Sequence, residues 1–175
     1  MLTVGHGGAS AESFLTLVRG AGLELVTDVR RFPGSRRHPQ FSQDELARSL
    51  ADGEVGYRWE ERLGGRRRSV PDSPNVGLRN ASFRAYADHM RTPEFHSALA
   101  QLLEDAGREA TAAMCAESLW WRCHRRLIAD ATVLLHGVEV RHVLPDGRQQ
   151  DHQPTEGAVV EGDVLVYRPP QGAML

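Results

Sequence analysis

Short apolar runs alternate with amphipathic helical patterns along most of the chain. Runs of apolar, often β-branched residues predict strands at residues 2–5, 23–29, 55–59, 110–115 and 138–144. Apolar positions at helical spacing, bounded by capping residues or glycine, predict helices at about 10–22, 42–53, 83–90, 92–107 and 120–137. Strands that alternate with helices are typical of an α/β fold. We therefore expect a single layered domain with a mostly parallel central sheet and flanking helices.

The end of the chain has a different pattern. Residues 145–157 are polar and predict a loop, and residues 164–167 predict a last strand that pairs as a hairpin with 159–160. No Pro/Gly/Ser-rich linker divides the chain, so we expect one domain over residues 1–175. No apolar run is long enough to span a bilayer, and the N-terminus has no secretory pattern. With two cysteines and no disulfide-rich pattern, the sequence predicts a cytoplasmic protein with reduced thiols and no membrane partner.

All 21 cationic residues are arginine, and the chain contains no lysine. This excludes a lysine Schiff base and a P-loop lysine, whereas a planar guanidinium grips phosphate or carboxylate at two points. The net charge of -2 argues against a uniformly basic nucleic-acid binder. The charge is uneven, because residues 30–37 contain four arginines and no acid, which predicts a local anion-binding face. Arg122 and Arg126 are expected on the solvated face of the last helix, where Arg126 and Asp130 have the spacing of an ion pair.

Polar side chains follow the predicted strands at their carboxyl ends, where ligands usually bind in an open parallel sheet. If these strands are neighbours in the sheet, the side chains converge on one cleft. The first turn of the helix predicted at 120–137, which presents Cys123 and Arg125, would also offer free N–H groups to an anion. The residues concerned are His6, Asp28, Arg30, Cys115, Glu117, Cys123, His124 and Arg125.

The strongest candidates each have a structural alternative. Cys115 is either a packed core thiol, which we favour, or a nucleophile. Glu117, just past a buried strand, either pairs with an arginine such as Arg125, which we favour, or acts as a general base. His124 lies at the centre of the apolar stripe of its helix and is either a core histidine or a site residue; we favour the site.

Spacing weakens several sharper motif interpretations. The interval from Cys115 to Arg122 is one residue longer than the Cys-x5-Arg loop of tyrosine phosphatases and rhodanese-like enzymes, which disfavours that mechanism. A zinc site at Cys115, Cys123 and His124 lacks a close Cys-x-x-Cys pair and would need another histidine from elsewhere, so we assign no metal ligand and no cofactor. The glycine-rich stretch 5–10 lacks the third glycine of the dinucleotide-binding motif.

Six motifs follow one another in order across residues 1–144. They are TVGHG at 3–7, VTDVRRFPGSRRHPQF at 26–41, YRWEERLGG at 57–65, FRAYADHM at 83–90, AMCAESLWWRCHRRLIA at 113–129 and VRHV at 140–143. This series resembles the domain-of-unknown-function 488 family (DUF488). The resemblance implies a single α/β domain of bacterial or archaeal type and implies no settled activity. It adds Pro33 and Ser35 to the candidate ligand-binding residues, and Gly7 stands where the family commonly has serine.

The sequence as a whole predicts a pocket for a small anionic or phosphate-bearing ligand, such as a nucleotide, in a protein that is a candidate enzyme. Arg30 and Arg125 would orient the anion, and Glu117 or His124 would transfer protons. Asp28 would hold an arginine or histidine in place.

Two alternatives remain open. The first is a nucleic-acid-binding module without catalysis, and the second is a metal-binding protein that uses its Cys and His residues. For the first, the charged and stacking groups would be Arg36, Arg37 and residues 66–68, with Phe32, Phe41 and Trp59.

Overall fold

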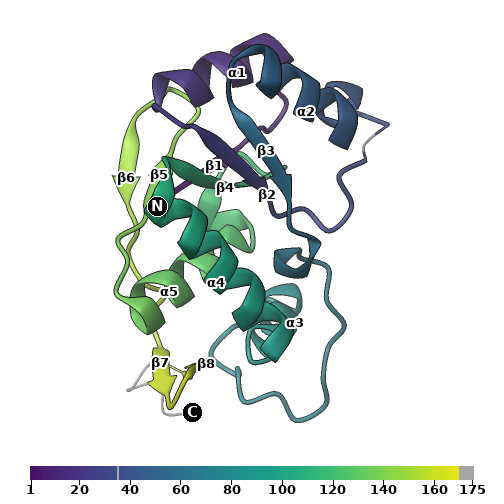
Figure 1. Cartoon of the computed structure of the whole chain (residues 1–175). Helices are drawn as coiled ribbons and strands as arrows, with labels where there is room; N and C mark the ends of the chain where they lie inside the picture. The colour runs from purple at the N-terminus through teal and green to yellow at the C-terminus, as the bar shows by residue number, and fades with distance from the viewer. Residues whose placement is uncertain (35, 170–175) are drawn as a thin grey trace.

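The computed structural model describes residues 1–34 and 36–169. Within this part of the chain, a sheet of six strands has the order β3-β2-β4-β1-β5-β6 (Figure 1). Strands β1 to β5 are parallel, and β6 pairs antiparallel with β5 at one edge. The expected α/β fold with a mostly parallel central sheet is thus confirmed. The strands are β1 Leu2–Gly5, β2 Leu25–Asp28, β3 Gly56–Trp59, β4 Thr111–Cys115, β5 Arg141–Val143 and β6 Gln149–Asp151.

Helices cover both faces of this sheet (Figure 1). Helices α1 (Ala11–Gly20) and α2 (Gln43–Asp52) share one apolar core with the sheet, and α3 (Ala81–His89), α4 (Pro93–Arg108) and α5 (Arg125–His136) share the other. Within the described residues, none of these helices has the length and apolar character needed to cross a membrane. The described residues also form three short 3-10 helices: η1 Pro39–Phe41, η2 Glu61–Leu63 and η3 Trp120–Arg122.

Strand β4 shows how one strand serves both cores. Successive side chains of a strand point to opposite faces of a sheet. Ala112 and Met114 therefore pack in the core under α1 and α2, whereas Ala113 and Cys115 pack in the core under α3, α4 and α5. Cys115 is the last residue of the strand, and its side chain lies on the face of the sheet that α5 covers.

The structure differs from the sequence-based expectation at two places. Strand β6 lies inside residues 145–157, which were expected to form a loop, because its exposed polar residues carry no apolar signal. Trp120 belongs to η3, and α5 begins only at Arg125. The expected C-terminal hairpin is present as β7 (Ala158–Glu161) and β8 (Val164–Tyr167), while residues 170–175 of the expected domain lie outside the described residues.

A chain of buried hydrogen bonds joins β1 to the C-terminal segment. The Thr3 hydroxyl lies 2.6 Å from His142 Nδ1, and His142 Nε2 lies 2.9 Å from His152 Nδ1. His152 Nε2 in turn lies 2.8 Å from Oδ1 of Asp130, whose Oδ2 accepts a hydrogen bond from the Tyr167 hydroxyl. A neutral imidazole donates at one ring nitrogen and accepts at the other, so His142 can link the Thr3 hydroxyl to His152. Burial, followed by the charges of His152 and Arg125, lowers the pKa of His142 to about 3.

The expected ion pair between Arg126 and Asp130 is wrong. Asp130 is fully buried and faces this hydrogen-bond chain. Arg126 Nε instead donates to the Thr155 hydroxyl at 2.7 Å. Helical spacing placed the two residues on one stripe, but the C-terminal segment covers that stripe and supplies other partners.

Acid should weaken the fold through His142. The unfolded chain takes up a proton on this ring below about pH 6.5, whereas the folded ring stays neutral down to about pH 3. The unfolding free energy should therefore fall as the pH falls through this window. His142→Gln should reduce that slope by up to about 1.4 kcal/mol per pH unit. Urea unfolding at a series of pH values measures the slope.

Thr3→Val is the matched control, because it removes a hydroxyl group from the same hydrogen-bond chain and no ionisable group. It should lower the unfolding free energy by about 1 kcal/mol and leave the slope unchanged. Equal slopes for the wild type and His142→Gln would contradict a lowered pKa of His142 in the folded protein.

Candidate functional site

A cavity of about 440 Å³ opens beyond the carboxyl ends of β2 and β4. It lies where an open parallel sheet usually binds its ligand. Four stretches line it, one after each of β2, η2 and β4 and one at the start of α5. They comprise residues 30–32, 65–66, 115–117 and 122–124.

The loop after β4 lies directly against the end of β1 because residue 5 is glycine. A Cβ at Gly5 would lie 2.0 Å from the Glu117 carbonyl oxygen and 2.7 Å from a guanidinium nitrogen of Arg125. The backbone N–H of His6 donates to the Cys115 carbonyl at 3.1 Å, which continues the β1–β4 pairing past the strand. Gly5 therefore sets how close this wall of the cavity can come to the sheet.

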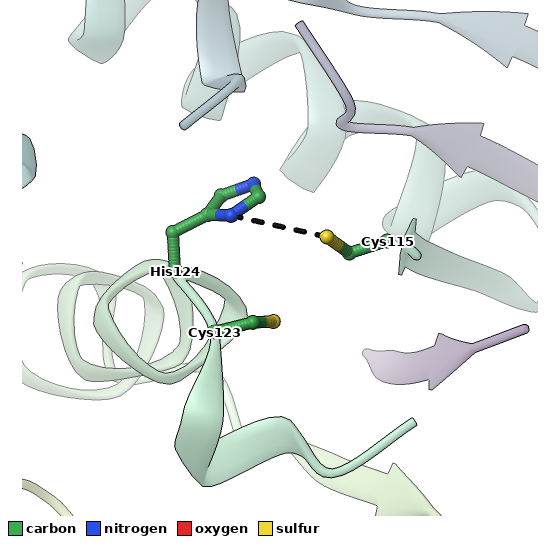
Figure 2. A group of neighbouring side chains, drawn as sticks. All are labelled: Cys115, Cys123 and His124. Atoms are coloured by element: carbon green, nitrogen blue, oxygen red, sulfur yellow. Dashed lines mark hydrogen bonds between the residues drawn. The ribbon is translucent and has the colours of Figure 1, made fainter. Parts of the chain in front are cut away.

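Three lining side chains meet at this point (Figure 2). Cys115 ends β4, and Cys123 and His124 lie just before α5. Their two Sγ atoms and His124 Nδ1 lie within 4.8 Å of one another, with Cys115 Sγ 3.9 Å from Nδ1. His124 Nε2 donates to the Val29 carbonyl at 3.0 Å. Burial lowers the pKa of His124, so the ring is neutral and its Nδ1 lone pair faces the sulfur atoms.

Arg125 lies fully buried beside this cluster. Its Nε donates to Cys123 Sγ at 3.2 Å, and a terminal nitrogen donates to the carbonyls of Glu117 and Ser118. Within the described part of the chain, no carboxylate lies at salt-bridge distance from it. A hydrogen bond from Cys123, followed by the charge of Arg125, lowers the pKa of Cys115 to about 7, whereas burial raises the pKa of Cys123.

The favoured pairing of Glu117 with Arg125 is wrong, because Arg125 bonds the backbone carbonyl of Glu117 and not its carboxylate. Carboxylate Oε1 instead accepts hydrogen bonds from the Leu119 N–H at 3.3 Å and the Ser118 hydroxyl at 3.4 Å. The side chain is half-buried and lines the cavity. Glu117 is the one carboxylate among the described residues that form the lining.

A second buried network holds Arg30 at the cavity. Asp28 accepts hydrogen bonds from Arg30 Nε at 2.8 Å and Nη2 at 2.6 Å, and the Tyr57 hydroxyl donates to the same carboxylate at 2.8 Å. Arg30 Nη1 donates to the Phe41 carbonyl at 2.8 Å and lies 3.3 Å from His6 Nε2. Burial lowers the pKa of His6 to about 4, so this ring can accept the bond as a neutral group. Asp28 thus fixes the direction of the Arg30 side chain.

The model of one protein family, described as "Domain of unknown function DUF488", matches residues 10–132. The chain belongs to the DUF488 family. This confirms the resemblance that the six ordered motifs carry. No curated protein and no solved structure matches the chain.

In this DUF488 protein, the residues suggested by the sequence occupy three kinds of position. Arg30, Cys115, Glu117, Cys123 and His124 line the cavity. His6, Asp28 and Arg125 are buried and contact lining residues. Pro33 lies outside the lining, against a neighbouring shallow depression, and Ser35 lies outside the described residues.

Sequence reasoning missed part of the lining. Arg122 was expected on a solvated helix face, but residues 120–122 form η3, which turns Arg122 to the cavity. Gly65 approaches His124 so closely that a Cβ there would lie 3.1 Å from Nδ1. The only local signal for it is the Gly-Gly pair before three arginines at 64–68.

Gly5→Ala should push the loop after β4 away from the sheet. The added Cβ meets backbone atoms, which cannot move as a flexible side chain would. We expect a loss of about 1–3 kcal/mol in unfolding free energy and greater reactivity of Cys115 toward thiol reagents. Gly107→Ala is the matched control, because nothing lies within 4 Å of its Cβ position in α4; it should stabilise by about 0.5–1 kcal/mol. Equal effects of the two substitutions in chemical denaturation would contradict the close contact.

Proposed function

We propose that the cavity binds a small phosphate-bearing anion and that Glu117 transfers protons to or from that ligand. The observation that carries the proposal is the composition of the lining. Four arginines and one carboxylate surround a recess at the carboxyl ends of parallel strands. Such a concentration of guanidinium groups in a concave site attracts anions and can grip phosphate oxygens in pairs.

Three of these arginines have no acidic partner among the residues that the structure describes. Arg30 is neutralised by Asp28. Within the described residues, Arg31, Arg66 and Arg122 have no carboxylate at salt-bridge distance, and Arg31 Nη1 donates only to the Arg66 carbonyl. Unpaired guanidinium groups around one recess repel one another, and a bound anion relieves that repulsion.

Glu117 is suited to proton transfer because its two oxygens differ in their surroundings. Oε1 is held by the Leu119 N–H and the Ser118 hydroxyl. Oε2 has no hydrogen-bond partner in the described part of the chain, so it can accept a proton from a ligand hydroxyl or a water molecule. The loop that Gly5 and Arg125 hold in place keeps this carboxylate at the cavity.

The structure gives less support to a nucleic-acid-binding module. Phe41 is fully buried and stacks on His6 with ring centroids 4.0 Å apart, so it cannot stack on a base. Arg67 donates to the carbonyls of Glu61, Arg62 and Gly64. Phe32 and Trp59 remain exposed, but Phe32 borders the same cavity and suits a small ligand equally, and Trp59 donates its Nε1–H to the Arg30 carbonyl.

Arg122→Ala should weaken anion binding. Loss of one charge-assisted hydrogen bond raises Kd for pyrophosphate by about 10- to 100-fold. Isothermal titration with phosphate and with pyrophosphate measures this change. Arg108→Ala is the matched control, since Arg108 is also exposed but lies on α4 and pairs with Glu104; it should leave Kd unchanged. Absence of binding by the wild type, or salt-sensitive binding of a single-stranded oligonucleotide with no response to pyrophosphate, would overturn the proposal.

Glu117→Gln should strengthen anion binding, in contrast to Arg122→Ala. It keeps a hydrogen-bond acceptor for the Leu119 N–H but removes the charge of the one carboxylate among the described lining residues. Pyrophosphate should therefore bind about two- to fivefold more tightly. Unchanged or weaker binding by this variant in the same titration would contradict repulsion between the Glu117 carboxylate and the bound anion.

A further inference from the structure

We infer that Cys115, Cys123 and His124 bind one zinc ion, with an open coordination position that faces the arginine-lined cavity. The metal site stands on its own geometry, and only the identity of the fourth ligand rests on the proposed anion-binding function. The three donors are the group in the described residues whose ligand atoms converge closely enough for a metal ion.

The distances fit zinc after small side-chain rotations. Zinc binds sulfur at about 2.3 Å and imidazole nitrogen at about 2.0–2.1 Å, which separates tetrahedral ligand atoms by about 3.5–3.8 Å. Cys115 Sγ lies 3.9 Å from His124 Nδ1, and no pair in the group is farther apart than 4.8 Å. Both cysteines are reduced and point toward the same space as the imidazole (Figure 2).

The groups around the donors are those that support a metal site. A metal-binding histidine usually donates its other ring N–H to a carbonyl or carboxylate, and His124 Nε2 donates to the Val29 carbonyl at 3.0 Å. Cys123 Sγ accepts hydrogen bonds from Arg125 Nε at 3.2 Å and from the Arg125 backbone N–H at 3.4 Å. Such bonds orient a thiolate and offset its charge. These contacts are independent of the distances among the three donors.

The donor set selects the kind of metal. Two thiolates and one imidazole suit zinc and disfavour magnesium and calcium, which take oxygen ligands. Three protein ligands with one open position are typical of catalytic zinc, whereas structural zinc has four. All three donors line the cavity, so the fourth position opens toward Arg31, Arg66 and Arg122. Two thiolates neutralise the zinc charge, which leaves the arginines to attract an anionic fourth ligand.

Cobalt substitution tests the site directly. Protein purified with a reductant, stripped with a chelator and titrated with Co²⁺ should bind one equivalent and show a thiolate-to-cobalt charge-transfer band that Zn²⁺ abolishes. Cys115→Ser, Cys123→Ser and His124→Ala should each weaken Co²⁺ binding at least tenfold, with folding checked by circular dichroism. His136→Ala is the matched control on an exposed turn of α5 and should bind as the wild type does.

The outcomes separate this inference from the proposed function. Addition of pyrophosphate should shift the cobalt spectrum of the wild type while the thiolate-to-cobalt charge-transfer band remains, which shows that the metal stays bound and supports an anion at the open position. Wild-type protein that binds less than one-tenth of an equivalent of Co²⁺ would overturn the zinc site. A Cys115–Cys123 disulfide that persists in protein purified with a reductant would overturn it as well. Pyrophosphate binding measured by calorimetry on such metal-free protein would leave the proposed function standing. Cobalt binding without any response to pyrophosphate would support the metal site and overturn its anionic ligand.

Discussion

The contact between the end of β1 and the loop after β4 is the constraint on which the site depends. It requires glycine at position 5, and it places the carbonyl of Glu117 within reach of Arg125. A guanidinium group fully removed from water needs several hydrogen-bond acceptors. Arg125 finds two in that loop and a third in the sulfur of Cys123. One buried cation thus fixes the loop, the second cysteine and the start of α5 relative to one another.

Much of the fold was predictable because its central strands are buried on both faces. Strands β1 and β4 are short apolar runs bounded by polar residues or glycine, as parallel strands usually are. Helix ends also carried clear signals: Ser10 caps α1 through Ser13 N–H, and Gly137 ends α5 with a φ of 65°. Strand β6 could not be predicted, because an exposed polar edge strand has no hydrophobic pattern to distinguish it from a loop.

The sequence predicted which strand ends carry the site, but not the contacts between its side chains. The parallel register places Gly5 beside Cys115 and Asp28 beside Met114, so residues that follow these strands must meet. Which atom a buried arginine reaches is a matter of side-chain packing, and that is why the partner of Glu117 was misjudged. His124 combines the two interpretations that the sequence posed as alternatives. Its ring is anchored to the core through the Val29 carbonyl, yet its other nitrogen borders the cavity.

The buried carboxylate of Asp130 depends on residues that lie beyond the end of the family match. The DUF488 match stops at residue 132, but the donors to Asp130 come from His152, Thr155 and Tyr167. A chain shortened to the matched region would keep the negative charge in its core and lose all three donors. An uncompensated buried charge costs several kcal/mol, a large share of the stability of a small domain. The C-terminal segment therefore supplies the hydrogen-bond donors that the Asp130 carboxylate of α5 needs. The family match ends between that carboxylate and its donors.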